Sequence, residues 1–146
     1  MFTLYTVLLT VHIVLVVLWV GAGSAQAVIG QRALKGGPAG REFYAEQLEW
    51  FGTKWFPAVS GLAALFGVLL WIDGPWELGE VWILIAVVGW IVSSVIGATQ
   101  LGPAVQAWRE GGARVDDPAW AKLQRFVRID QVLLMLIIAD MVIKPG

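Results

Sequence analysis

Long stretches without a charged residue constrain this sequence more than any other feature. No charged side chain occurs before Arg32, and two further uncharged stretches cover 55–72 and 81–101. A bilayer core of about 30 Å needs roughly 20 helical residues to cross it, so each stretch is long enough, or nearly so, to span a membrane. A fourth apolar stretch, interrupted by Asp140, ends at Ile143. The sequence therefore predicts an all-α fold, a four-helix transmembrane bundle forming one integral membrane domain over 1–146, with spans of about 4–27, 55–72, 81–101 and 126–143.

The composition narrows the classes of function. The chain is 58% hydrophobic and 14% charged, a balance typical of a membrane protein with the lipid bilayer as its main partner. A net charge of −1 gives no basic surface for nucleic acid. The absence of cysteine excludes a disulfide framework, a thiol nucleophile and a cysteine-based metal site.

The distribution of cations predicts how the chain is threaded. Of the ten Lys and Arg residues, nine lie in the two long connections and only Lys144 lies elsewhere. Under the positive-inside rule, both connections are cytoplasmic and both termini are outside, as in a multi-pass protein of the bacterial inner membrane. Asp117 and Pro118 form a helix start signal, so the fourth helix should begin well before its span.

The second and fourth helices are therefore both expected to extend into the cytoplasm. There the acidic residues of one could face the basic residues of the other, namely Glu42, Glu46 and Glu49 opposite Lys122, Arg125 and Arg128. Solvated faces with weak surface pairing are the alternative.

Small residues at steps of four indicate where helices approach closely in lipid. Gly89, Ser93 and Gly97 form one such face on the third span, and Ala63 with Gly67 forms another on the second. These faces could pack the bundle itself, or could serve a homo-oligomer or a larger membrane complex.

His12, the only histidine, lies among leucines and valines in the first span. Counted from Leu4, it lies roughly 12 Å below the outer end of its helix. An imidazole in that position suggests a haem or metal ligand, or a proton-transfer group. The structural alternative is a neutral ring hydrogen-bonded to a neighbouring helix. Trp19, seven residues on, shares its face.

Two residues of the fourth helix could complete a site with His12. Asp140 could orient the imidazole, or could simply pair with Lys144 four residues later. Met135 lies roughly 13 Å below Lys144, near the expected depth of His12, and a His/Met pair can hold haem iron. Met135 could equally be a packing residue. With one histidine per chain, two-histidine haem ligation within the chain is excluded, and no HExxH, Walker or Ser-His-Asp motif occurs.

The pattern His12-x6-Trp19-x-Gly21 resembles the opening of a bacterial membrane superfamily. That superfamily includes the CopD-type copper-resistance proteins, the HemJ-type protoporphyrinogen oxidases and a family of small integral membrane proteins without assigned activity. "REFYAEQLEWFGTKWFPAVSGLAALFGVLLW" resembles their second helix, and "DQVLLMLIIADMVIKPG" resembles the ending of the small family. The resemblance implies a four-helix membrane fold, haem b as cofactor and His12 as its ligand. HemJ-type enzymes also depend on a lysine in a later membrane helix, and here 55–72 and 81–101 contain none.

Three functions follow as hypotheses. The first is a haem-binding, redox-linked membrane protein with His12 as axial ligand. The second is a non-catalytic scaffold or accessory subunit packed through Gly89, Ser93 and Gly97. The third is a small metal or proton-coupled transporter that uses His12 and Asp140 and acts as an oligomer. The sequence leaves enzymatic activity open.

Overall fold

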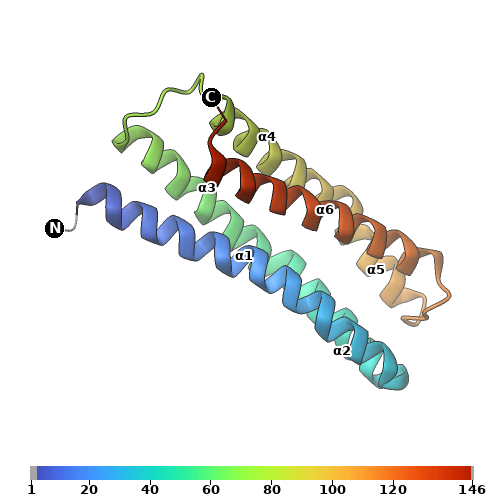
Figure 1. Cartoon of the computed structure of the whole chain (residues 1–146). Coiled ribbons are helices and arrows are strands. Elements are labelled where there is room, and N and C mark those ends of the chain that lie inside the picture. The colour runs from blue at the N-terminus through green and yellow to red at the C-terminus, as the bar shows by residue number, and fades with distance from the viewer. Residues whose placement is uncertain (1–2, 146) are drawn as a thin grey trace.

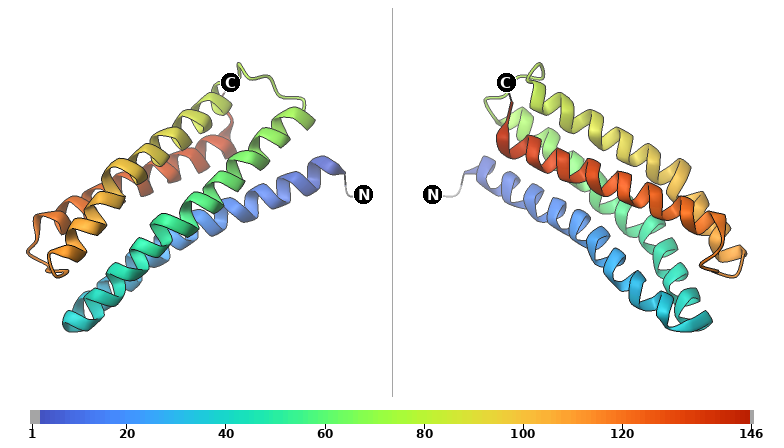
Figure 2. Two further views of the ribbon diagram at one scale, coloured as in Figure 1. Left: turned by 180° about the vertical axis from the view of Figure 1, so that it is seen from behind. Right: turned by 45° about the vertical axis from the view of Figure 1, so that its right-hand side comes forward.

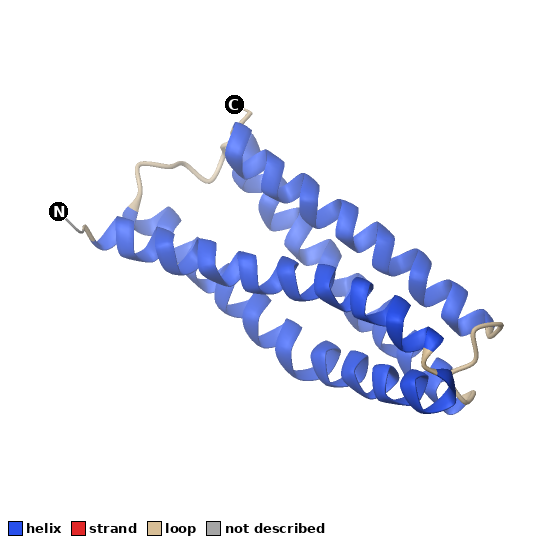
Figure 3. Cartoon of the chain, turned by 60° about the horizontal axis from the view of Figure 1, so that its bottom comes forward, coloured by secondary structure: helices blue, strands red, loops and turns tan. Residues whose placement is uncertain are grey.

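The computed structural model describes residues 3–145, and within that range every regular element is a helix (Figures 1 and 3). The elements follow one another in this order: α1 (Leu4–Lys35), α2 (Gly37–Trp50), η1 (Phe51–Trp55), α3 (Phe56–Asp73), α4 (Val81–Ile96), η2 (Gly97–Leu101), α5 (Gly102–Glu110) and α6 (Pro118–Ile143). The segments α2–η1–α3 and α4–η2–α5 are continuous, so the described chain forms four helical runs. The predicted start of the last run is confirmed, because the Asp117 side chain accepts a hydrogen bond from the Ala119 N–H at 2.8 Å.

The segments η1 and η2 are short π-helices, and a proline follows each at the same distance. Pro57 lies two residues after η1, and Pro103 lies two residues after η2. A proline cannot donate to the carbonyl four residues before it, and its ring crowds that carbonyl. The residue at that position is Thr53 in one run and Thr99 in the other. Widening the preceding turn relieves the crowding without ending the helix.

The four runs form two helical hairpins (Figures 1 and 2). In hairpin 1, α1 packs along α2 and α3; in hairpin 2, α6 packs along α4 and α5. The main contacts between the hairpins are α2 with α5 and α1 with α6. The start of α1, the end of α6 and the loop before α4 lie at one end of the bundle, which we call the termini end. The two other turns lie at the opposite end, which we call the connection end.

The main buried core lies at the connection end and joins the two hairpins. It consists of Tyr44, Ala45, Ala104, Val105, Trp108, Ala113, Trp120 and Leu123. The Trp108 and Trp120 rings lie 4.5 Å apart, and the Tyr44 ring meets both edge-on at 6.2 and 6.4 Å. The Trp108 indole N–H donates to the Arg114 carbonyl at 2.8 Å, and the Tyr44 hydroxyl donates to the Gln26 carbonyl at 3.0 Å. We call this cluster the connection-end core.

The seam between α4 and α6 uses two of the three small residues at steps of four. A Cβ at Gly89 would lie 2.6 Å from Ile137 Cδ1, so the Ile137 side chain packs directly over the Gly89 backbone. The Ser93 hydroxyl donates to Asp130 Oδ1 at 2.6 Å. A Cβ at Gly97 would meet nothing within 4 Å. Gly89 and Ser93 therefore pack the chain against itself.

Three helical runs are long and apolar enough to cross a membrane: Leu4–Lys35, Gly37–Asp73 and Val81–Glu110. The final run is more charged, because its stretch 126–143 holds Arg128, Asp130 and Asp140. Large apolar side chains are exposed along all four runs, for example Val17, Leu65, Val88 and Leu136. A surface of this kind is typical of helices that face lipid.

Candidate functional site

The His12 side chain is buried between helices, with 8% of the residue exposed. Its Nδ1 lies 2.8 Å from the backbone carbonyl oxygen of Ala63 in α3. Because a carbonyl can only accept a hydrogen bond, Nδ1 must carry the proton and donate it. Nε2 of the neutral ring then holds the lone pair, and this buried atom has no hydrogen-bond partner among the described residues.

The small residues of α3 create the space for this ring. Ala63 and Gly67 are one helical turn apart, and a Cβ at Gly67 would lie 3.3 Å from His12 Cε1. The imidazole therefore lies directly against the α3 backbone. The two small residues noted in the sequence accommodate a polar ring as well as a close helix approach.

Asp140, on α6, is equally buried, with 8% exposed, and neither carboxylate oxygen has a hydrogen-bond partner among the described residues. The sequence offered an ion pair between Asp140 and Lys144 as one of two alternatives. That ion pair does not occur among the described residues. Lys144 is in the left-handed region, with φ 49°, at the end of α6. Its ammonium lies over the rings of Trp76 and Trp82 instead, at 4.2 and 5.1 Å.

The register between α1 and α6 shows which residue of α6 comes level with His12. The Ser24 hydroxyl donates to Gln131 Oε1 at 3.3 Å, which aligns these antiparallel helices. At 1.5 Å per residue, His12 lies roughly 18 Å and Asp140 roughly 14 Å from that point toward the termini end. Met135 lies only roughly 6 Å from it. Along the bundle axis, Asp140 is therefore near the level of His12 and Met135 is not.

The exposure of the candidate residues agrees with this register. Met135 is 50% exposed, whereas His12 and Asp140 are buried. Trp19 is half-buried on the helix that carries His12. The Nε2 lone pair of His12 and the carboxyl group of Asp140 therefore lie in the same half of the bundle, and neither has a hydrogen-bond partner among the described residues. Met135 lies at a different level along the bundle axis.

A polar layer that the sequence analysis did not identify lies deeper in the bundle. It consists of the Ser24–Gln131 pair between the hairpins and the Ser93–Asp130 pair within hairpin 2. The available signal was the sequence Ile129-Asp130-Gln131-Val132, which places two polar residues between apolar ones at the start of the last apolar stretch. These side chains hydrogen-bond one another across helices, so we interpret the layer as structural.

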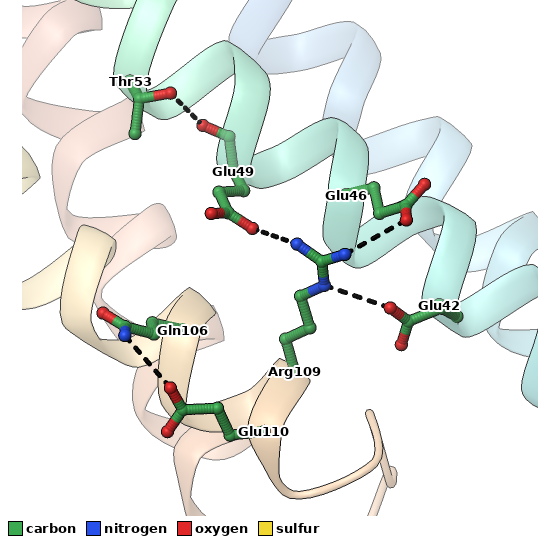
Figure 4. Close-up of polar contacts among 7 residues, drawn as sticks. All are labelled: Glu42, Glu46, Glu49, Thr53, Gln106, Arg109 and Glu110. Carbon is green, nitrogen blue, oxygen red and sulfur yellow. Dashed lines mark hydrogen bonds and ion pairs between the residues drawn. The ribbon is translucent and has the colours of Figure 1, made fainter.

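The acidic residues of α2 bind a cation that the sequence pattern did not single out. The Arg109 guanidinium of α5 binds three glutamates: Nε meets Glu42 at 3.0 Å, one terminal nitrogen meets Glu46 at 3.1 Å, and the other meets Glu49 (Figure 4). The pairing with Lys122, Arg125 and Arg128, one of the two alternatives, does not occur among residues 3–145, because α5 rather than α6 lies along this face of α2. The hydrogen bonds to Glu42 and Glu49 raise the pKa of Arg109.

The three glutamates around Arg109 are paired with its guanidinium and are about half-exposed. Glu42, Glu49, Gln106, Arg109 and Glu110 line an open surface depression of about 380 Å³. Within residues 3–145, no group of three His, Cys, Asp or Glu side chains is placed to hold a metal ion. Arg109 neutralises part of the acidic face and fastens α2 to α5.

The comparisons with known proteins give no assignment. No family model matches the chain, and neither a curated protein nor a solved structure matches it. The resemblance to the CopD and HemJ families therefore stays a prediction, and any function has to be argued from the residues described above.

Proposed function

We propose that this chain is a haem-binding, redox-linked membrane protein in which His12 would hold the haem iron through Nε2. The observation that carries the proposal is the orphaned Nε2 lone pair of a buried imidazole whose Nδ1–H is held by the Ala63 carbonyl. A metal-ligating histidine usually donates its other ring N–H to a carbonyl or carboxylate, which fixes the tautomer and the ring orientation. An intramembrane ionisable residue is, moreover, a functional candidate by default.

The residues of this chain would perform three tasks at such a site. Ala63 would keep the proton on Nδ1, and Gly67 would keep the ring against α3. Haem b would supply one-electron redox chemistry when bound. Met135 is not proposed as a second ligand, because the α1–α6 register separates it from His12.

The proposed threading has both termini outside and four crossings. The uneven distribution of Lys and Arg supports the orientation, because the cations cluster at the connection end. The seam with α4 supports a crossing by α6, because Gly89 and Ser93 hold α6 along a helix that is apolar enough to span. If α6 crosses the bilayer in this way, its buried acidic side chains would face other helices of the bundle rather than lipid acyl chains.

An absorption spectrum of the purified protein from haem-replete cells tests the proposal. We expect a Soret band in the wild type and its loss in His12→Gln, which can still donate an amide hydrogen bond but offers no imidazole nitrogen. Gly67→Val should displace the ring and weaken or shift the band. Gly61→Val is the matched control, because a Cβ at Gly61 meets nothing within 4 Å. A wild type without the band, or a His12→Gln variant that retains it, would refute the proposal.

A proton-coupled transporter is the second candidate function. It is favoured by Asp140, which lies near the level of His12 and whose two buried carboxylate oxygens have no hydrogen-bond partner in the part of the chain that the structure describes. A liposome flux assay separates it from the first proposal, since loss of flux in Asp140→Asn with the Soret band retained would indicate transport. The scaffold hypothesis receives less support, because Gly89 and Ser93 are already occupied by α6.

A further inference from the structure

Two tryptophans at the termini end surround a cation that belongs to the chain itself. The Trp76 ring, from the loop before α4, and the Trp82 ring, from the start of α4, lie 5.3 Å apart at an angle of 88°. The Lys144 ammonium lies over both rings, 4.2 Å from the Trp76 centroid and 5.1 Å from that of Trp82. Perpendicular aromatic faces around an ammonium group have the geometry of an aromatic cage. We call Trp76 and Trp82 the tryptophan cage.

Neighbouring groups hold both rings in place. The Trp76 N–H donates to the Tyr5 hydroxyl of α1 at 3.4 Å, and the Trp82 N–H donates to a Glu80 carboxylate oxygen at 2.5 Å. A Cβ at Gly74 would lie 2.7 Å from the Trp76 ring, so glycine is required for the ring to lie there. The cage is therefore built by three segments of the chain and does not depend on Lys144 alone.

The Lys144 ammonium contacts the two tryptophan rings, although the carboxylates of Glu80 and Asp140 belong to the same two helix ends. Among the described residues, Lys144 has no carboxylate oxygen within ion-pair distance, which is 4.0 Å. Glu80 is engaged by the N–H groups of Trp82 and Glu77. The Asp140 carboxylate, one turn earlier on α6, has no hydrogen-bond partner within residues 3–145. A site that holds a cation by aromatic faces favours weakly hydrated cations, such as alkylated ammonium ions, over a strongly hydrated lysine.

We propose that the tryptophan cage is a binding site for an organic ammonium ion and that Lys144 is its resident competitor. Lys144 is exposed, so a ligand can displace it. The displaced ammonium has a partner four residues away, the unpaired carboxyl group of Asp140, and the backbone of Lys144 is already bonded to the Asp140 carbonyl at 2.7 Å. Ligand binding at the cage is thereby coupled to pairing of Asp140. The ligand can be a dissolved cation or the headgroup of a choline lipid, since both carry the same quaternary nitrogen.

Titration with tetramethylammonium chloride tests the cage, in a maltoside detergent that has no ammonium headgroup, with sodium chloride as the ionic control. Calorimetry should show saturable binding that is about tenfold tighter in Lys144→Met than in the wild type, because the tethered competitor is gone. In the Lys144→Met background, Trp76→Leu should weaken binding by about tenfold. Trp50→Leu should leave it unchanged, because Trp50 lies at the end of α2 and outside the cage. Asp140→Asn should weaken binding to the otherwise wild-type protein, because displaced Lys144 then loses its alternative partner.

Two results would overturn the inference. One is a folded Lys144→Met variant without saturable tetramethylammonium binding; the other is binding that Trp76→Leu and Trp82→Leu both leave unchanged. Reconstitution into phosphatidylcholine or phosphatidylglycerol vesicles separates the two sources of ligand. Competition by phosphatidylcholine alone identifies a lipid headgroup, and unchanged affinity in both vesicles identifies a dissolved cation. None of these measurements involves haem, so their outcome is independent of the proposal for His12.

Discussion

Replacement of Trp108 tests whether the connection-end core joins the two hairpins. Trp108 is fully buried, with 0% exposed, and contacts Tyr44 of hairpin 1 and Trp120 of α6. A tryptophan buries up to about 250 Å², which at about 25 cal/mol per Å² corresponds to roughly 6 kcal/mol. Because the unfolded chain already hides part of this area, and because alanine retains some burial, the expected loss is smaller. Trp108→Ala should lower the free energy of unfolding by about 3–5 kcal/mol.

A second variant separates the contribution of packing from that of the hydrogen bond. Trp108→Phe keeps an aromatic ring but removes the N–H that binds the Arg114 carbonyl. Its cost should be about 1–3 kcal/mol, which combines the unpaired carbonyl with the lost ring volume. Comparison of the two unfolding free energies therefore separates the contribution of apolar packing at Trp108 from that of its hydrogen bond.

The assay is reversible unfolding in detergent followed by circular dichroism, which does not depend on the tryptophan that is removed. Trp50→Ala is the control, because Trp50 is 50% exposed and lies outside the connection-end core. The reasoning is refuted if Trp108→Ala costs less than about 1 kcal/mol, or no more than Trp50→Ala.

Two further predictions concern the same core and the seam of hairpin 2. Burial raises the pKa of Tyr44 to about 12, whereas an unfolded tyrosine ionises near pH 10, so the stability from the neutral phenol is present below about pH 10 and is lost as the pH rises toward 12. Unfolding measured between these pH values should show a decrease of up to about 3 kcal/mol that Tyr44→Phe removes, and an unchanged slope in the variant would contradict the assignment. Gly89→Leu should separate α4 from α6 and cost about 1–3 kcal/mol, because even a Cβ there would lie 2.6 Å from Ile137. Gly97→Leu, on the same stripe of small residues, should cost little when unfolding in detergent is followed by circular dichroism, and equal effects of the two variants would show that the seam is placed incorrectly.

The helical class and the approximate element positions could be predicted from local signals. Uncharged stretches of the right length and the Asp117–Pro118 start signal act within a few residues of where they occur. The ends of the elements were less predictable. The first helix runs on to Lys35 and the third run continues to Glu110. Gln31 and Gln106 lie in these extensions, and because glutamine has a good intrinsic helix propensity, its polarity does not mark the end of a helix.

The partners of the polar groups depend on how the hairpins meet, which no local signal contains. His12 could be singled out as the only histidine of an apolar helix, but its bond to Ala63 joins residues 51 positions apart. The acidic face of Glu42, Glu46 and Glu49 could be identified from the sequence. Its partner Arg109 could not, because Arg109 is brought to this face by α5, a helix that the sequence did not predict. Spacing left open whether Asp140 pairs with Lys144, because it carries no information about the loop that brings the Trp76 ring to the Lys144 ammonium.

The position of the connection-end core determines which physical force holds the two halves of this molecule together. Between helices in lipid there is no hydrophobic driving force, since acyl chains are as apolar as leucine. The connection-end core instead lies among charged residues such as Arg41, Glu42 and Lys122. Under the proposed threading these residues are outside the bilayer, where water competes for the apolar surface of the core. With that threading, attachment of one hairpin to the other should show the heat-capacity change of a soluble protein and should weaken on cooling and in urea. The stability of the pairing within each hairpin should depend instead on the surrounding lipid.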